Sequence, residues 1–174
     1  MTLVIQPDTK NVIGLFGTCD NVRWRDPFMA RYKAEDIPYF NPMIDDWNEA
    51  FVPIEAHHLA NDPIVLFPVL AQSYGMGSLS EMGFGPLRAI KQNFYRSFVV
   101  LIHPQVTQEL QDKDPVMAKA SKRARALVLG HLAKVAADNI VIVPTLDDML
   151  DVSLKLQKAH AILTEVAPIR LQTA

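Results

Sequence analysis

The chain has 174 residues, of which 49% are hydrophobic and 21% are charged, and its formal net charge at pH 7 is −2. This composition is typical of one globular domain, so we expect residues 1–174 to fold as a unit. The weak negative charge gives no electrostatic reason to expect a nucleic acid or a membrane surface as partner. Because the sequence shows neither a signal peptide nor an apolar run of roughly 20 residues, we expect a cytoplasmic protein.

The numbers and spacing of cysteine and histidine argue against a disulfide-bonded protein and against a metalloprotein. Cys19 is the only cysteine, and the five histidines are scattered or adjacent rather than spaced as metal ligands are. We therefore expect no internal disulfide, no metal site and no cofactor.

Five short apolar runs, each bounded by Pro, Gly, Asn or Asp, predict buried β-strands. These runs are Val12–Gly17, Ile37–Phe40, Ile64–Leu70, Ser97–Ile102 and Ile140–Val143. Segments of helical periodicity lie between and after them, at Asp26–Ala34, Pro53–Ala60, Leu79–Gln92, Pro115–Ala137 and Leu146–Thr164. Asp114 before Pro115, and Thr145 with Asp148, supply the side chains that cap helix starts, whereas Pro86 predicts a kink or a restart.

Buried strands that alternate with helices predict a parallel sheet covered on both faces. Right-handed crossovers and the length of the chain favour a flavodoxin-like doubly wound α/β fold with strand order 2-1-3-4-5. In such folds ligands bind beyond the carboxyl ends of strands one and three. We therefore expect the functional residues at that edge of the sheet.

A glycine-rich segment follows the third predicted strand. Residues 75–85 contain four of the seven glycines of the chain and surround one carboxylate, Glu81. One interpretation is a capping box, in which Ser78 caps a helix and Glu81 reaches back to it. The other is a ligand site, because glycines let the backbone approach a ligand closely. The sequence alone leaves both interpretations open.

Both tryptophans follow predicted strand ends. Trp24 comes after the first strand and Trp47 after the second. Two indoles at one edge of the sheet predict a planar aromatic ligand, since indoles stack on flat rings. The alternative is that each tryptophan plugs the rim of the core.

An ordered series of segments in the first half of the chain resembles a known family. The series is Gly14-Leu15-Phe16-Gly17-Thr18-Cys19 with Trp24-Arg25, Tyr39-Phe40-Asn41-Pro42 with Asp45-Asp46-Trp47, Glu55 with His58-Leu59, Ile64 to Pro68, and Gly77-Ser78-Leu79-Ser80-Glu81-Met82-Gly83-Phe84. In this order the segments resemble the nucleoside 2-deoxyribosyltransferase-like family. The second half of the chain matches only in its rhythm of strands and helices.

The resemblance implies that Glu81 is a nucleophile that attacks the sugar C1′ and expels the nucleobase. A second base, or water, then resolves the glycosyl-enzyme intermediate with retention, which suits a carboxylate and an oxocarbenium-like transition state. The leaving base needs a proton or a hydrogen bond, for which Asp45, Asp46 and Glu55 are the candidates. We expect backbone and hydroxyl donors at the helix start to favour the charged form of Glu81.

The same resemblance implies a set of substrate-binding residues. They are Gly17, Thr18, Trp24, Arg25, Asn41, Asp45, Trp47, Ser73, Gly77 and Ser78. The substrate is a nucleoside or a nucleotide. Related enzymes are oligomers, so we expect a homodimer or a higher homo-oligomer. The helix predicted at Pro115–Ala137 is a candidate interface, although it is equally suited to packing on the sheet.

Two alternative functions remain open. Many transferases of this family carry an aspartate shortly before the glycines, where this chain has Ala71-Gln72-Ser73-Tyr74. Relatives that hydrolyse nucleoside 5′-monophosphates use a serine there, and Ser73 or Ser78 with Arg23 or Arg25 would hold the phosphate. For either arginine the alternative is a solvated surface position. Finally, the fold also suits a non-catalytic nucleotide-binding or interaction module.

Overall fold

The computed structural model describes residues 11–19, 22–44, 48–82, 96–135 and 138–171. Its strands in chain order are β1 (Ile13–Leu15), β2 (Tyr39–Phe40), β3 (Ile64–Val69), β4 (Ser97–Ile102) and β5 (Ile140–Ile142). They form one sheet of order β2-β1-β3-β4-β5 in which every neighbouring pair is parallel. The predicted fold class and strand order are therefore confirmed.

The centre of the sheet is the long pairing of β3 with β4. It runs in register from Ile64 opposite Ser97 to Val69 opposite Ile102, and every residue of both strands is buried. This complete burial explains why these strands are continuous apolar runs in the sequence, since both faces of a parallel sheet are covered.

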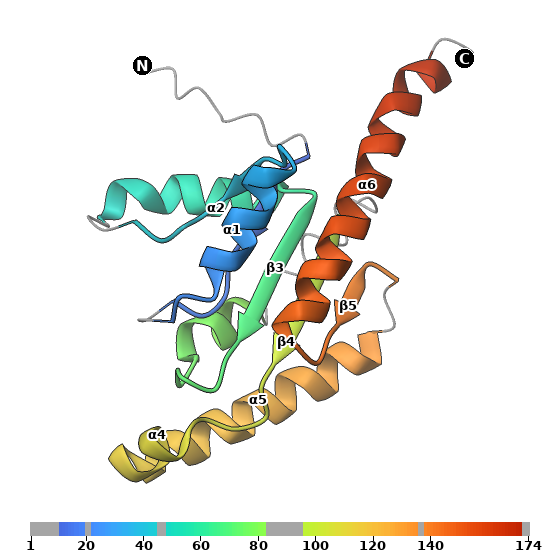
Figure 1. Ribbon diagram of the computed structural model, residues 1–174. Coiled ribbons are helices and arrows are strands. Elements are labelled where there is room, and N and C mark those ends of the chain that lie inside the picture. The colour runs from blue at the N-terminus through green and yellow to red at the C-terminus, as the bar shows by residue number, and fades with distance from the viewer. Residues whose placement is uncertain (1–10, 20–21, 45–47, 83–95, 136–137, 172–174) are drawn as a thin grey trace.

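Helices cover both faces of the sheet (Figure 1). On one face lie α1 (Arg25–Ala34) and α6 (Leu146–Leu171), which contribute Phe28 and Met149 to the core, together with Trp24 directly before α1. The other face packs against α5 (Pro115–Val135) and a helix at residues 76–82, which we call the Glu81 helix. The helix α2 (Val52–Asn61) contributes Leu59 to that face.

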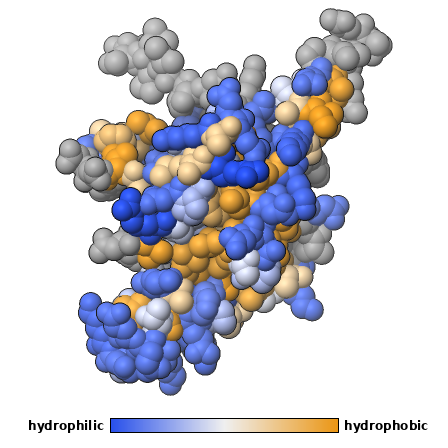
Figure 2. All heavy atoms as spheres, in the orientation of Figure 1, coloured by the Kyte–Doolittle hydropathy of each residue, from blue (hydrophilic) through white to orange (hydrophobic). Residues whose placement is uncertain are grey.

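Two short elements have no counterpart in the prediction. They are the 3-10 helix η1 (Glu49–Phe51) and the helix α4 (Gln108–Lys113). No residue of α4 is buried, and Figure 2 shows hydrophilic atoms over it at the lower left. A helix of six residues without an apolar stripe leaves no periodic pattern to detect. It begins at Thr107, whose hydroxyl accepts a hydrogen bond from the amide of Leu110.

The predicted caps of the two long C-terminal helices are confirmed. The Asp114 carboxylate accepts from the amide of Met117 at 2.9 Å, and the Thr145 hydroxyl accepts from the amide of Asp148 at 3.1 Å. The helix predicted at Leu79–Gln92 instead begins at residue 76. Its part beyond residue 82, with the kink expected at Pro86, lies outside the described residues.

Gly17 closes the first strand in a conformation that requires glycine. Its φ is +85°, and a Cβ at this position would lie 2.5 Å from the carbonyl oxygen of Pro68 in β3. Strand β1 thus approaches β3 closely and ends in a turn that L side chains rarely adopt.

Replacing Gly17 by alanine should lower the free energy of unfolding by about 2–4 kcal/mol, because backbone strain and a steric clash add. Gly130→Ala is the matched control, since Gly130 is helical and a Cβ there meets nothing within 4 Å. The control should gain roughly 0.5–1 kcal/mol. Urea unfolding measures both values, and a Gly17→Ala protein as stable as the wild type would contradict this account of the turn.

Candidate functional site

The carboxyl ends of the strands gather the residues of interest. In Figure 1 the arrowhead of β3 points toward the region that holds the Glu81 helix, α4 and the first half of α5. The chain passes from β1 outward to β2 and then returns to β3, so the strand order reverses between β1 and β3. Ligands of open α/β sheets bind at such a point.

The end of β1 is held by Arg25. The guanidinium of this buried side chain donates to the carbonyl oxygens of Leu15 and Thr18, each at 2.8 Å, and to that of Phe16 at 3.3 Å. Desolvation lowers the pKa of Arg25 below its usual range, although the nearby Cys19 sulfur opposes this effect. The Trp24 indole also donates to the Thr18 carbonyl, and the Arg25 guanidinium lies 4.5 Å from its ring centroid.

Three predicted substrate-binding residues thus have structural roles. Trp24 is 3% exposed and packs edge-on against Phe28, so its ring has almost no surface for stacking on a base. The guanidinium of Arg25 donates its hydrogen bonds to backbone carbonyls of the chain. The Thr18 hydroxyl donates to the Pro68 carbonyl and accepts from the Leu70 amide, so it ties the end of β1 to the end of β3. The core interpretation of Trp24 is therefore the one that the structure supports.

Two other predicted residues are also engaged. Asn41 accepts from the amide of Met43 and donates to the sulfur of Met29. Arg23 has an 85% exposed side chain and pairs with Asp26 at 2.7 Å, which agrees with the solvated alternative. Asp45, Asp46 and Trp47 lie outside the described residues.

The ends of β3 and β4 are held by Arg125 of α5, a residue that the sequence analysis did not single out. Its side chain is fully buried and donates to four carbonyl oxygens, at distances of 2.6 to 3.0 Å. The acceptors are Val69, Leu70, Ser73 and His103. Desolvation lowers the pKa of Arg125 to about 10, so the guanidinium stays charged at neutral pH. In the sequence, one arginine within an amphipathic helix gives no indication that it will bind these backbone carbonyls.

The Glu81 helix begins directly after this anchored loop. Gly75 has a φ of +66°, its amide donates to the hydroxyl of Ser73, and its carbonyl accepts from the amide of Leu79. Because helical residues begin at 76, Ser78 lies within the helix and is not its cap. The capping-box interpretation of Ser78 and Glu81 is therefore wrong, and the backbone turn at Gly75 is the reason.

The electrostatics of Glu81 also differ from the prediction. Its pKa is raised above the usual value, first by partial desolvation and second by the negative charge of Glu55 in the first turn of α2. Donors at the helix start do not dominate, because Glu81 lies beyond the first turn. The structure thus brings Glu55 within electrostatic reach of Glu81, and a perturbed carboxylate at a sheet edge is a candidate for chemistry.

Open space borders the Glu81 helix on the side of Gly77. A Cβ at Gly77 would meet no atom of the described residues within 4 Å, and Gly77 is exposed. Packing therefore does not explain this glycine, which leaves close approach of a ligand as an interpretation. Ser78 is half-buried beside it.

Two cavities of the described part of the structure border α5. One of about 420 Å³ lies between α4 and α5 and is lined by polar residues that include Gln108 and Lys119. The other, of about 430 Å³, is mainly apolar and is lined by Leu129, Gly130 and the Arg125 side chain among others. The residues that the structure describes contain no group of three or more His, Cys, Asp or Glu side chains able to hold a metal ion.

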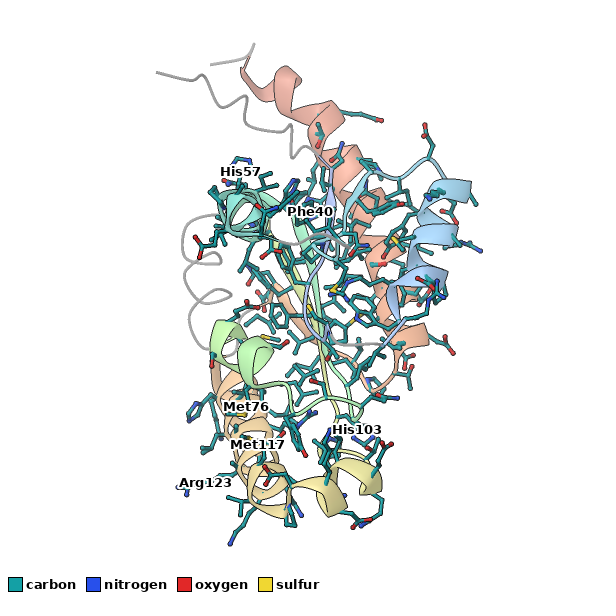
Figure 3. All side chains as sticks on the ribbon, turned by 90° about the vertical axis from the view of Figure 1, so that its left-hand side faces the viewer. Phe40, His57, Met76, His103, Met117 and Arg123 are labelled. Carbon is teal, nitrogen blue, oxygen red and sulfur yellow. The ribbon has the colours of Figure 1, made fainter. Side chains whose placement is uncertain are left out.

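A second buried polar cluster lies at the opposite, amino edge of the sheet. His58 stacks on Phe40 at 3.7 Å between ring centroids and pairs with Asp62 at 2.8 Å. Arg96 donates to the backbone carbonyls of Asp62 and Leu59. In Figure 3 Phe40 and His57 mark this end of the molecule, far from Met76, Met117 and Arg123. The cluster anchors α2, the helix that carries Glu55.

Burial sets the protonation of this pair. Desolvation raises the pKa of Asp62 to about 8, against the opposing charge of Arg96. Desolvation and the neighbouring His57 lower the pKa of His58. At neutral pH the folded protein therefore holds Asp62 as the neutral acid beside a neutral His58.

Replacing Glu55 by glutamine should lower the pKa of Glu81 toward its ordinary value of 4.5, because one of the two causes of the shift is removed. An NMR pH titration of the Glu81 carboxyl carbon measures this change. Glu109→Gln in α4 is the control and should leave the midpoint unchanged. An unchanged Glu81 midpoint in Glu55→Gln would show that the two carboxylates are not coupled.

Stability should fall as the pH rises from about 6.5 to 8, because the folded Asp62 keeps a proton that the unfolded chain has released. Below about 6.5 the lowered pKa of His58 acts in the opposite direction, since the unfolded histidine takes up a proton there before the folded one does. The sign follows from a folded-state pKa that lies above the ordinary value of 3.8. Asp62→Asn should remove this dependence. Urea unfolding at a series of pH values measures the difference between the two proteins, and parallel profiles would disprove the buried proton.

No family model matches the chain, and no curated protein matches it either. None of the helices in the described ranges has the length and apolar character needed to cross a membrane.

Proposed function

We propose that the protein breaks and re-forms the N-glycosidic bond of a nucleoside, with Glu81 as the nucleophile. One observation supports this most strongly. Glu81 lies in the helix that follows the carboxyl end of β3, with a raised pKa and with Glu55 close enough to contribute to the shift. Pairs of carboxylates with separated pKa values are typical of glycosyl-transferring sites. The resemblance in the first half of the chain points to the same residue.

In the proposed reaction a carboxylate oxygen of Glu81 forms a bond to C1′ as the bond from C1′ to the base nitrogen breaks. The electron pair of the broken bond goes to the base, which takes up a proton. A second base, or water, then attacks C1′ from the opposite side and releases Glu81, so two inversions give net retention. A raised pKa makes the ionised carboxylate a better nucleophile, because it is a stronger base.

Glu55 has two possible roles in this scheme. As a general acid it would deliver the proton to the leaving base. As a fixed negative charge it would favour the positive charge that develops on the sugar. Asp45 and Asp46 remain candidates for the same roles. The open space at Gly77 supports a ligand that approaches the backbone of the Glu81 helix.

Hydrolysis of a nucleoside 5′-monophosphate is the second candidate function, and one observation favours it. The buried guanidiniums of Arg25 and Arg125 donate to carbonyl oxygens near the ends of β1 and β3, without a carboxylate partner among the described residues. The positive charge of the two guanidiniums would attract a phosphate. Direct contact would come from Ser78, because the hydroxyl of Ser73 already accepts from Gly75 and Arg23 pairs with Asp26.

We keep the expectation of a homo-oligomer as part of this proposal. The helix α5 carries a half-exposed Leu127 and an exposed Val116, but its charged residues in Pro115–Val135 are all basic. Two copies of α5 would therefore repel each other if packed face to face. Sedimentation velocity gives the oligomeric state.

A non-catalytic nucleotide-binding or interaction module stays the alternative from another class of function.

Replacing Glu81 by glutamine should reduce cleavage of the glycosidic bond by several orders of magnitude, since the nucleophilic charge is lost while the shape is kept. The assay incubates the protein with deoxynucleosides and, separately, with their 5′-monophosphates, each with and without a free acceptor base. Glu109→Gln in α4 is the control and should keep full activity.

The assay also separates the alternatives. Base exchange that needs the acceptor identifies a transferase, whereas release of base from monophosphates alone identifies the hydrolase. If Glu81→Gln keeps the turnover of the wild type, Glu81 is not the nucleophile. Binding without any release of base would support the non-catalytic module.

A further inference from the structure

We infer that Arg125 is a positioning residue that sets the place of Glu81 through the loop before the Glu81 helix. This inference rests on the proposed function for its catalytic meaning. Its structural part stands on the contacts of Arg125 alone. The two parts are tested by different measurements below.

The loop from Val69 to Gly75 is bound to α5 by side-chain hydrogen bonds, in addition to backbone bonds from the segment that follows β4. Arg125 donates to the carbonyls of Val69, Leu70 and Ser73, and Ser121 donates to the carbonyl of Tyr74 at 2.7 Å. Arg125 Nε in turn donates to the Ser121 hydroxyl at 3.0 Å. One turn of α5 thus binds four of the seven carbonyls of the loop. In Figure 3 the turn that carries Met76 lies beside the part of α5 that carries Met117 and Arg123.

The connection from this loop to Glu81 is short and rigid. The Ser73 hydroxyl accepts from the Gly75 amide, and the Gly75 carbonyl accepts from Leu79, the first amide bonded within the Glu81 helix. A Cβ added at Gly75 would lie 2.7 Å from a methyl of Val69 and 3.3 Å from the Arg125 guanidinium. The start of the helix therefore rests on the guanidinium itself.

A lysine cannot reproduce this arrangement. The four carbonyl bonds diverge from two nitrogens of one plane, and a third nitrogen bonds Ser121. An ammonium has three donors on a single nitrogen, whereas the guanidinium presents five donors in a fixed fork. Without the side chain, the carbonyl of Val69 would keep the amide of His103 and that of Leu70 the amide of Ser73. The carbonyl of the buried Ser73 would lose the Arg125 donor, which is unfavourable unless water or an ion replaces it.

The apolar cavity beside α5 offers a route for such a replacement. This cavity of about 430 Å³ is lined by Arg125, together with Ala126, Leu129 and Gly130. Truncation of Arg125 to alanine would join the vacated volume to that cavity. A free guanidinium ion has the shape, the charge and the planar donors of the missing group.

The test compares Arg125→Ala and Arg125→Lys with the wild type, with and without millimolar guanidinium chloride. Hydrogen exchange of the amides at residues 75–82 reports the loop and the helix start directly. We expect at least tenfold faster exchange there in Arg125→Ala, and guanidinium should restore much of the protection. Methylammonium at the same concentration should not, since it lacks the planar fork. Arg125→Lys should show an intermediate loss, and it decides the question if Arg125→Ala does not fold.

Activity under the same conditions tests the catalytic part. We expect turnover of the active substrate to fall at least tenfold in Arg125→Ala with little change in KM, and to recover with guanidinium. Arg96→Ala is the control, because Arg96 is buried and bound to carbonyls but lines neither described cavity. Guanidinium should restore nothing in that variant.

The outcomes separate the inference from the proposed function. Protection at residues 75–82 that is unchanged in both Arg125 variants overturns the inference. Loss of protection that is uniform over the chain, or that guanidinium does not restore in a folded variant, also overturns it. If the wild type has no glycosidic activity, the exchange measurement still decides whether Arg125 holds the loop, and only the proposed function fails.

Discussion

Parallel strands end with carbonyl groups that need hydrogen-bond donors. In this protein two buried arginines donate to several of these carbonyls. Arg25 binds three carbonyls at the end of β1, and Arg125 binds four at the ends of β3 and β4 and in the following loop. Buried backbone acceptors without partners are costly, so these contacts make the turns of the carboxyl edge possible. A buried guanidinium is itself unfavourable unless its donors are satisfied, and here the carbonyls satisfy them. Each group thus makes the other's burial tolerable.

The proposed chemistry depends on this arrangement. The loop held by Arg125 leads to the turn at Gly75, and that turn starts the helix at residue 76 and places Glu81 beyond its first turn. There, partial desolvation and the charge of Glu55 raise the pKa of Glu81. The amino edge contributes indirectly, since the pair of His58 and Asp62 anchors the helix that carries Glu55.

The sequence was sufficient to predict the sheet, because strands buried on both faces appear as uninterrupted apolar runs, such as Ile64–Val69. It was not sufficient for the site. A single buried arginine such as Arg125 looks like any polar residue of a helix, and only the tertiary structure brings the carbonyls to it. Trp24 was predicted to contact a ligand because the sequence shows its position at a strand end. The sequence does not show its packing against Phe28. The positive φ of Gly75 moved the helix start, and with it the role of Ser78. Glu55 and Glu81 were identified through a resemblance, and the structure adds that they are electrostatically coupled.

The central claim is that Glu81 forms a bond to the sugar, and trapping that bond tests it most directly. A nucleoside with fluorine at C2′ destabilises the oxocarbenium-like transition state, and a good leaving base lets the first step proceed while the second is slowed. Mass spectrometry of the digested protein then locates the sugar. The account predicts a fluorinated sugar on the peptide that contains Glu81, and none in Glu81→Gln. A sugar on a different residue, or release of the base with no covalent adduct under conditions that trap the intermediate, would contradict it.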